Sequence, residues 1–345
     1  MFSYLEYFLI FCVATICCGS LTLLMRKFAE KFEIVDKPNE LHKTHMAPVP
    51  YLGGVAIIIT ILGGLLVGTI FVNLNQTVLL NVSTIAIPAL VLGIVGLFDD
   101  LFNLSPFSRF VAQTLAGLFT AASIITSNTM GAPTRNVVLD FLLTIFWIVG
   151  ITNAINFFDN HDGGAAGTIA ISSLGLFWLS AISEQFYIAA LALLISGSML
   201  GFLFWNRSPA KIYMGDAGSL FLGTLLSSIL IRFEPSTFQK SVGFAIPILL
   251  LAIPILDTSV VVSSRISNGR SPFKGGQDHL SHRLSRLGIS KKKVALILWT
   301  MSFIFTSLAI LVSSVNQPLE KYVLLLSLLL WCVLFIFFIR DFQYV

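Results

Sequence analysis

The chain has 345 residues, of which 56% are hydrophobic and only 11% are charged, against roughly 25% charged residues in soluble domains. This composition excludes an ordinary soluble protein, and the net charge of +4 does not indicate nucleic-acid binding, because the basic residues lie in short loops between apolar runs. Several runs are about 20 residues long, enough for a helix to cross a bilayer, and the alternating segments of a membrane β-barrel are absent. We therefore predict an all-α polytopic membrane protein.

Eleven apolar segments are predicted to be transmembrane helices. Their approximate bounds are 4–25, 52–73, 79–98, 107–126, 137–154, 166–183, 186–205, 217–232, 242–264, 293–314 and 320–340. Pro247 and Pro254 should kink the ninth segment, because proline lacks the amide proton that a helix interior uses. Arg26 and Lys27 follow the first segment directly and no basic residue precedes it, so we interpret it as a retained helix rather than a cleaved signal peptide.

The basic residues predict an orientation for these segments. Of the 21 Lys and Arg residues, 17 fall on one face of the predicted bundle. That face comprises the loops at 26–51, 99–109, 155–165, 206–216 and 265–293, together with Arg340. By the positive-inside rule this face is cytoplasmic, with the N-terminus outside and the C-terminus inside. All five histidines and the aspartates apart from Asp140 share this face, so we expect a single domain, 1–345, whose cytoplasmic loops form one polar site.

The first polar loop is DKPNELHKTHMAPVPYLGG at 36–54, which is basic and supplies Lys43 and His45. The next feature is the pair Asp99 and Asp100, at the C-terminal end of the third segment. Two adjacent carboxylates there repel each other and the negative end of the helix dipole, and a divalent cation would relieve both. Hard oxygen ligands favour Mg²⁺ or Mn²⁺; a solvated helix end is the alternative.

The stretch NAINFFDNHDGGAAG at 153–167 concentrates polar side chains where the fifth segment ends. Asn153, Asn156, Asp159 and Asp162 are followed by glycines that begin the sixth segment. Asn and Asp side chains can recognise the edge of a sugar or a nucleobase. This much polarity at a membrane boundary is excessive for a connecting turn, so we predict a binding loop.

The stretch KIYMGDAGSLFLG at 211–223 places Asp216 at the cytoplasmic N-terminal end of the eighth segment. Gly215 and Gly218 allow backbone amides to approach an anion closely, and the helix dipole favours that anion. Asp216 would hold a metal ion that bridges the anion. The alternative is a glycine turn with Asp216 as the N-cap of the helix.

Two further features lie near the C-terminal third of the chain. Asp257, in IPILDT, is an ionisable group close to the kinked ninth segment, where such groups are usually functional. In GGQDHLSHRLSRLG at 275–288, His279 and His282 share one face if the segment is helical. With Arg283 they would bind phosphate. A zinc site is a weaker interpretation because no Cys is near, and a basic cytoplasmic loop is the other alternative.

In chain order, the motifs DKPNELHKTHMAPVPYLGG, GLFDDL, NAINFFDNHDGGAAG, KIYMGDAGSLFLG and DHLSHRL resemble those of the polyprenyl-phosphate N-acetylhexosamine-1-phosphate transferases. The closest branch contains the bacterial undecaprenyl-phosphate GlcNAc-1-phosphate transferases, which begin O-antigen, enterobacterial common antigen or teichoic-acid linkage units. The resemblance implies transfer of a sugar 1-phosphate, with GlcNAc the expected sugar, from a UDP-sugar to undecaprenyl or another polyprenyl phosphate, releasing UMP. It also implies an active site on the cytoplasmic face of the plasma or inner membrane.

The resemblance further implies roles for individual residues. Asp99 and Asp100 match the family's catalytic pair, Asp216 its metal-binding acid, and His279 the first histidine of its histidine motif. We expect Asp100 to help Asp216 hold Mg²⁺, or Mn²⁺, as the cofactor. The predicted substrate-binding residues are Lys43, His45, Asn153, Asn156, Asp159, Asp162, Tyr213, His282 and Arg283, with Tyr213 at a position that stacks on uracil in relatives. A homodimer is also expected, because relatives are often dimers.

The chain departs from the family pattern in three places, one of them near His42, where the usual pattern is Arg-Lys-x-His. Ser281 stands where a histidine is usual, and Asn160, His161 and Gly164 replace a glycine, an apolar residue and a leucine. The chain also lacks the run of consecutive histidines typical of the phospho-MurNAc-pentapeptide transferases of peptidoglycan synthesis, so that activity ranks second.

Two other classes of membrane protein fit the sequence less well. An ion-coupled transporter would place ionisable groups near the bilayer midplane, on broken helices in paired repeats, whereas here the acids gather at one face. A CDP-alcohol phosphotransferase is rejected, because Gly167 stands where that family's pattern requires an arginine.

Overall fold

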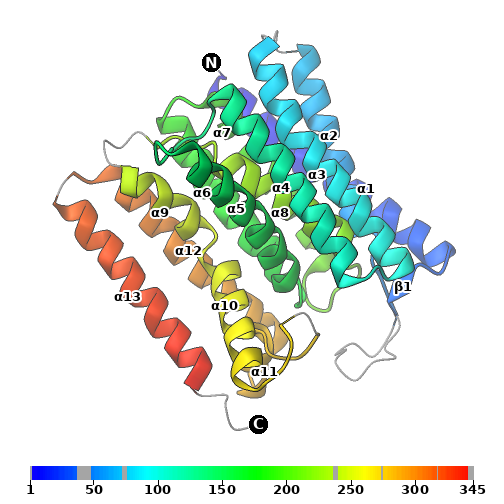
Figure 1. Cartoon of the computed structure of the whole chain (residues 1–345). Coiled ribbons are helices and arrows are strands. Elements are labelled where there is room, and N and C mark those ends of the chain that lie inside the picture. The colour runs from blue at the N-terminus through cyan, green and yellow to red at the C-terminus, as the bar shows by residue number, and fades with distance from the viewer. Residues whose placement is uncertain are drawn as a thin grey trace.

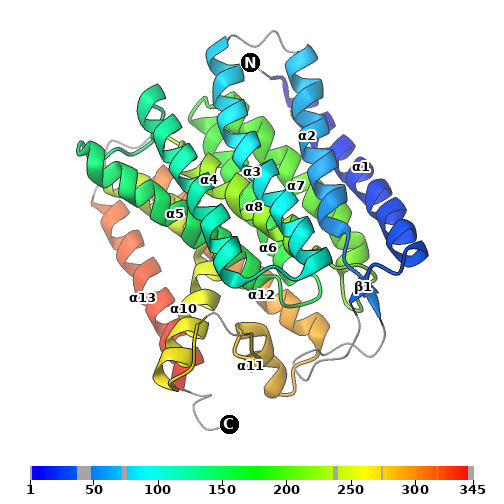
Figure 2. The same cartoon turned by 45° about the vertical axis from the view of Figure 1, so that its right-hand side comes forward.

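The computed structural model describes residues 2–36, 48–71, 76–235, 240–272, 275–316 and 318–340, and these ranges form a bundle of helices (Figures 1 and 2). The strands of the described part are β1 (Val35–Asp36) and β2 (Val49–Pro50), which pair antiparallel beside the end of α1 (Tyr4–Lys31). The predicted class, an all-α polytopic membrane protein, is confirmed by this helical architecture.

Within the described ranges, nine helices are long and apolar enough to cross a membrane. They are α1, α2 (Gly53–Phe71), α3 (Gln76–Phe102), α4 (Pro106–Ser127), α5 (Val137–Phe158), α6 (Gly164–Ile182), α7 (Phe186–Asn206), α12 (Lys291–Ser314) and α13 (Leu319–Arg340). The pair α9 (Lys240–Leu250) and α10 (Ala252–Ser267) is bent by 74° and makes a tenth span if it crosses once. The eighth predicted segment forms α8 (Gly215–Leu230), whose 16 residues are shorter than the other spans.

α8 lies inside the bundle, packed against α2, α3 and α5. Every residue from Ala217 to Leu230 is buried. Glycines allow the neighbouring helices to approach its first turn: a Cβ on Gly96 of α3 would lie 2.2 Å from the carbonyl oxygen of Asp216. A Cβ on Gly54 of α2 would lie 2.2 Å from the backbone nitrogen of Gly218. Backbone contacts on two sides therefore fix the start of α8, and with it Asp216.

The predicted kink in the ninth segment is confirmed, and the break falls between α9 and α10. Pro254 has no amide proton to donate to the carbonyl of Leu250, four residues earlier. The Ser172 hydroxyl of α6 donates to that carbonyl instead, at 2.6 Å. The Trp331 indole of α13 donates to the Ala252 carbonyl at 3.2 Å. The Ser172 hydroxyl thus satisfies the carbonyl that Pro254 leaves without a helical donor, as an apolar environment requires.

The polar motifs meet at one end of the bundle. In Figures 1 and 2 the N-terminus lies at the top, while β1 and the short helix α11 (Leu280–Arg286) lie at the opposite end. α3 runs down toward that end, so Asp99 and Asp100 in its last turn reach the same region. The loops that carry the other described motifs lie at this end as well, because successive helices run in opposite directions.

Candidate functional site

A cleft of about 630 Å³ opens at this end of the bundle. Nearly every segment with a polar motif contributes to its wall. The predicted site residues that line it are Asp99, Asp100, Asn156, Asp159, Asp162, Tyr213, Asp216, His279 and His282. Arg109, Asn160, His161, Arg265 and Lys291 also line it. The structure therefore brings together side chains from α3, α4, α8 and α11 and from the loop that follows α5.

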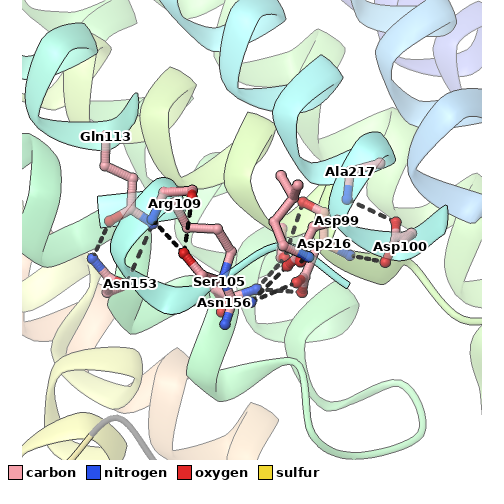
Figure 3. Close-up of polar contacts among 12 residues, drawn as sticks. Asp99, Asp100, Ser105, Arg109, Gln113, Asn153, Asn156, Asp216 and Ala217 are labelled. Atoms are coloured by element: carbon pink, nitrogen blue, oxygen red, sulfur yellow. Dashed lines mark hydrogen bonds and ion pairs between the residues drawn. The ribbon is translucent and has the colours of Figure 1, made fainter. Parts of the chain in front are cut away.

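Two carboxylates converge on one cation at the centre of the cleft (Figure 3). The Nη1 nitrogen of Arg109 donates to Asp99 Oδ2 at 2.7 Å and to Asp216 Oδ2 at 2.9 Å. Asn156 donates from Nδ2 to Asp216 Oδ1 at 2.7 Å and to Ser219 Oγ at 2.9 Å. Asp99 is only 6% exposed, so its charge is taken from water and needs a nearby positive partner. Arg109 supplies that partner in this structure.

Asp100 caps α8 from a neighbouring helix. Its two carboxylate oxygens accept hydrogen bonds from the backbone N–H groups of Asp216, at 2.8 Å, and Ala217, at 3.0 Å. These amides belong to the first turn of α8 and have no carbonyl partner inside the helix. Gly215 precedes them with a φ of 72°, a left-handed conformation that favours glycine. The alternative that Asp216 itself caps this helix is therefore wrong.

The loop after α5 forms a second acidic wall. Asp159 is the C-cap residue of α5, and the buried Asp162 accepts the N–H of Ala210 at 3.2 Å. Desolvation, reinforced by the charges of Asp216 and Asp162, raises the pKa of Asp159 to about 7. Burial also raises the pKa of Tyr213, with Asp162 as the next contribution. Two acids on one wall thus lie opposite Asp216, and one of them titrates near neutral pH.

The same loop is anchored to the helices around it. Gly163 has a φ of 72°, and its N–H donates to Asn206 Oδ1 of α7 at 2.9 Å. Its carbonyl accepts the indole N–H of Trp299 of α12 at 3.0 Å. These bonds hold the glycine turn that carries the two acids.

Two residues that depart from the family pattern contact each other. Ser281 of α11 donates from Oγ to Asn160 Oδ1, and Asn160 Nδ2 donates to the carbonyl of Phe157 at 2.7 Å. His161 Nε2 lies 2.9 Å from the Lys291 carbonyl at the start of α12. The loop that carries Asp159 and Asp162 is therefore fastened to α11 and α12.

The histidine motif forms the third wall. His279 is the N-cap residue of α11, and its Nδ1 lies 2.7 Å from Asp257 Oδ2 of α10. The His282 ring lies beside it, with 5.7 Å between centroids. Burial, followed by the charge of His279, lowers the pKa of His282 to about 4, so His282 is neutral at pH 7.

Comparison with known protein sequences identifies the family of this chain. Residues 82–234 match the family model of glycosyl transferase family 4. A probable undecaprenyl-phosphate N-acetylglucosaminyl 1-phosphate transferase of Bacillus subtilis strain 168 is 33% identical over 318 residues, which cover 90% of this chain and 86% of that protein. The chain belongs to glycosyl transferase family 4. The resemblance inferred from the motifs is thereby confirmed.

Other relatives match over similar lengths. The undecaprenyl-phosphate alpha-N-acetylglucosaminyl 1-phosphate transferase of Thermotoga maritima is 31% identical over 315 residues, covering 91% of each chain. A phospho-N-acetylmuramoyl-pentapeptide-transferase of Streptococcus suis strain 05ZYH33 is 30% identical over 294 residues, covering 78% of this chain and 84% of that one. Both branches considered from the motifs are therefore represented among the relatives.

Two predicted site residues within the described ranges, Asn153 and Arg283, do not line the cleft, and two others cannot be placed. Lys43 and His45 lie outside the described residues. The Asn153 side chain donates to Gln113 Oε1 of α4 at 2.6 Å, and Asn153 is not among the residues that line the cleft. Arg283 is 2% exposed, and its guanidinium donates to the carbonyls of Asp278, at 2.6 Å, and Phe338, at 2.7 Å. The expectation that Arg283 binds phosphate beside His279 is corrected, because α11 turns its guanidinium toward the main chain of α13.

The central cation, Arg109, was missed by the sequence analysis. Arg109 contributed only to the number of basic residues in its loop, which served to orient the segments. A stronger signal was available: it lies ten residues after Asp99, one turn into the helix that follows the acidic pair. A helix that returns from a tight loop places its first turn beside the last turn of the preceding helix.

The acidic centre fits a divalent cation by its chemistry. Hard carboxylate oxygens of Asp99 and Asp216 already converge on one positive group. No group of three or more His, Cys, Asp or Glu side chains in the described ranges has a metal-holding arrangement, and zinc gains no support. Both oxygens of Asp100 accept backbone N–H groups of α8, so Asp100 does not point toward the same cation as Asp99 and Asp216. Mg²⁺, however, is commonly held by one or two carboxylates together with substrate phosphates and water. Two carboxylates on a substrate cleft meet that requirement.

Proposed function

We propose that this chain transfers N-acetylglucosamine 1-phosphate from a UDP-sugar to undecaprenyl or another polyprenyl phosphate. The products are a polyprenyl diphosphate sugar and UMP, at the start of a cell-envelope glycan. The observation that carries the proposal is the acidic cleft around Asp99 and Asp216, at the end of a membrane-type helix bundle. Relatives at 31% and 33% identity, matched over nine-tenths of this chain, bear the corresponding names. Transfer of phospho-MurNAc-pentapeptide is the second candidate, since its relative matches less of the chain.

The proposed arrangement in the membrane is a single domain with eleven spans. The bent pair α9–α10 counts as one of them and the buried α8 as another. The N-terminus lies outside, and the cleft and the C-terminus lie on the cytoplasmic side of the inner membrane. The bias of 17 basic residues toward the cleft end supports this orientation, because cytoplasmic loops collect Lys and Arg. A homodimer is part of the proposal.

Both substrates are anionic, and one carries a long apolar tail, so they must meet at the membrane surface. Arg109, Arg265 and Lys291 line the cleft and would raise the local concentration of phosphates. Asn156 and Asp162 would hydrogen-bond the nucleotide-sugar, and Tyr213 would stack on its base. A phosphate monoester has a second pKa of about 6 and is largely dianionic at pH 7, so the acceptor needs no strong base.

A Mg²⁺ ion, with Mn²⁺ as the alternative, would neutralise the diphosphate and the departing UMP. We propose Asp216 and Asp99 as the protein ligands. Asp100, first expected beside Asp216, instead holds the first turn of α8 with both its oxygens. Asp99 would also orient the acceptor phosphate or take up its remaining proton.

The test is release of UMP by the purified protein from UDP-GlcNAc, undecaprenyl phosphate and Mg²⁺. Asp216→Asn should lower kcat by about 100-fold or more, the scale reported for groups that stabilise developing charge. Asp140→Asn is the matched control, because Asp140 is a buried acid that accepts the Thr134 N–H at the other end of α5. Full activity of Asp216→Asn would remove that residue from the mechanism.

The same preparation separates the rival functions. Faster turnover of UDP-MurNAc-pentapeptide than of UDP-GlcNAc would assign the chain to the peptidoglycan branch. Uptake of radiolabelled sugar into vesicles without UMP release would support a transporter. Removal of Mg²⁺ with EDTA should stop UMP release, and re-addition should restore it.

A further inference from the structure

Asp257 is a fully buried carboxylate that the cleft lining does not include. It lies on α10 and is 0% exposed. Each of its oxygens has one partner on the segment that begins α11: Oδ2 lies 2.7 Å from His279 Nδ1, and Oδ1 accepts the N–H of Leu280 at 2.7 Å. A buried carboxylate requires such partners, because an unpaired charge in an apolar environment is costly. Of the residues that line the cleft, Asp257 contacts His279 through its side chain.

The pairing determines which imidazole nitrogen is left for a ligand. A carboxylate can only accept, so His279 Nδ1 carries the proton in this hydrogen bond. In the neutral ring the other nitrogen, Nε2, is then an acceptor. Nε2 has no hydrogen-bond partner in the part of the chain that the structure describes, and His279 lines the cleft. The free nitrogen is therefore available to a bound substrate.

The remaining contacts leave the ring little freedom to turn. The Phe157 ring meets it edge-on, at 6.3 Å between centroids and an interplanar angle of 89°. His282 packs on it from the same helix. α11 itself is held by the bond from Arg283 to the Phe338 carbonyl. The His279 ring is therefore held at Nδ1 by Asp257 and on its sides by the Phe157 and His282 rings.

We propose that Asp257 is a positioning residue that sets the tautomer and the orientation of His279, so that the unprotonated Nε2 faces the cleft as the acceptor for a proton-bearing group of the reacting substrates, such as a sugar hydroxyl or a phosphate that still carries its proton. This inference rests on the proposed transferase function. Carboxylate–histidine pairs of this kind hold the imidazole in one tautomer, and losing the carboxylate impairs the histidine without removing it. Asp257 itself touches no substrate.

Asp257→Asn tests the proposal with little change of volume. The Asn carbonyl oxygen can still accept the Leu280 N–H, while its amide nitrogen donates to His279 Nδ1 and shifts the ring proton to Nε2. We expect kcat to fall about 10- to 100-fold, with the KM of both substrates and the thermal midpoint close to those of the parent. Asp140→Asn, again the matched control for a buried acid, should keep full kcat.

Two further measurements separate positioning from mere structural support. In the double variant with His279→Gln, Asp257→Asn should cause no additional loss of kcat, because residues that act as a unit are not additive. Additive losses would overturn the proposal. Nitrogen-15 NMR of histidine-labelled protein should show the Nδ1–H tautomer for His279 in the parent and the Nε2–H tautomer in Asp257→Asn; the same tautomer in both would also overturn it.

The design distinguishes the two levels of inference. If the parent releases no UMP, the proposed function fails, while the NMR measurement still decides the role of Asp257. If the parent releases UMP and Asp257→Asn keeps full kcat, the positioning role fails and the transferase function stands.

Discussion

The Arg109 guanidinium lies between the carboxylates of Asp99 and Asp216, where a divalent cation would also bind. The guanidinium bonds to both Asp99 and Asp216, so metal binding must compete with it. A bound metal would release Arg109 to contact a substrate phosphate, for which a guanidinium is well suited. One arginine can therefore neutralise the acids before the metal binds and assist substrate binding afterward.

Arg109→Gln should make the protein respond more strongly to Mg²⁺. The variant should have a lower thermal midpoint than the parent in EDTA, because Asp99 and Asp216 then repel each other without a counter-ion. Added Mg²⁺ should raise the midpoint more in the variant than in the parent, since the metal no longer displaces a side chain. Arg26→Gln, which breaks an exposed pair with Glu30, is the control. An equal Mg²⁺ response in variant and parent would contradict this competition.

Asp159 predicts a pH dependence with a definite sign. Its pKa rises from 3.8 to about 7 on folding, so the folded state holds this proton more tightly than the unfolded state. Between about pH 4 and pH 7 the ionisation of Asp159 therefore lowers the stability of the fold progressively. In EDTA, the difference in thermal midpoint between Asp159→Asn and the parent should grow in favour of the variant from pH 5 to pH 8. A difference that does not change with pH would show that Asp159 titrates normally.

At the scale of elements, the cleft depends on how loops and helices are fastened to one another. The loop after α5 is joined to α11 by Ser281 and Asn160, and to α12 by His161. These contacts explain two departures from the family pattern that the sequence alone left without a reason. The Ser281 hydroxyl donates to the Asn160 side-chain oxygen, although the two residues lie 121 positions apart in the sequence.

The pair should be energetically coupled. Asn160→Ala and Ser281→Ala should each destabilise the fold, and the double variant should lose about 1 kcal/mol less than the sum of the two, the usual net value of one hydrogen bond. The KM for UDP-GlcNAc should rise in all three variants, because the acids of the loop lose their fixed position. Thr300→Ala, whose hydroxyl bonds only within α12, is the control. Strict additivity would mean that the contact contributes nothing.

The elements also show where prediction from sequence succeeds. Apolar runs of sufficient length identify helices because a bilayer demands internally satisfied backbones, and the prolines of the ninth segment located its break. Asp99, Asp216, Asn156 and Asp159 were recognised because polar groups are conspicuous at the ends of apolar helices. Arg109 and Asp257 were harder to assign, since their roles depend on pairs that close over 107 and 22 positions. Spacing along one segment carries no information about such partners.

At the scale of the whole molecule, the polar cleft and the opposite end of the bundle should face different compartments. Single cysteines in a background without the four native ones test this on intact cells with a membrane-impermeant maleimide. Ser127→Cys, at the exposed end of α4, should be labelled directly. Arg270→Cys, exposed after α10, should be labelled only after the cells are permeabilised. The reverse pattern would place the cleft outside and remove access to a cytoplasmic nucleotide-sugar.

The close approach of α2 and α3 to the first turn of α8 has a consequence for engineering donor specificity. At Gly54 and Gly96 the packing is backbone against backbone, so no substitution there can enlarge the cleft. The loop after α5, in contrast, is held by side-chain contacts, chiefly those of Asn160, His161 and Ser281 with α11 and α12. Libraries that aim at bulkier sugars should therefore vary the loop after α5 and leave the glycines of α2 and α3 unchanged.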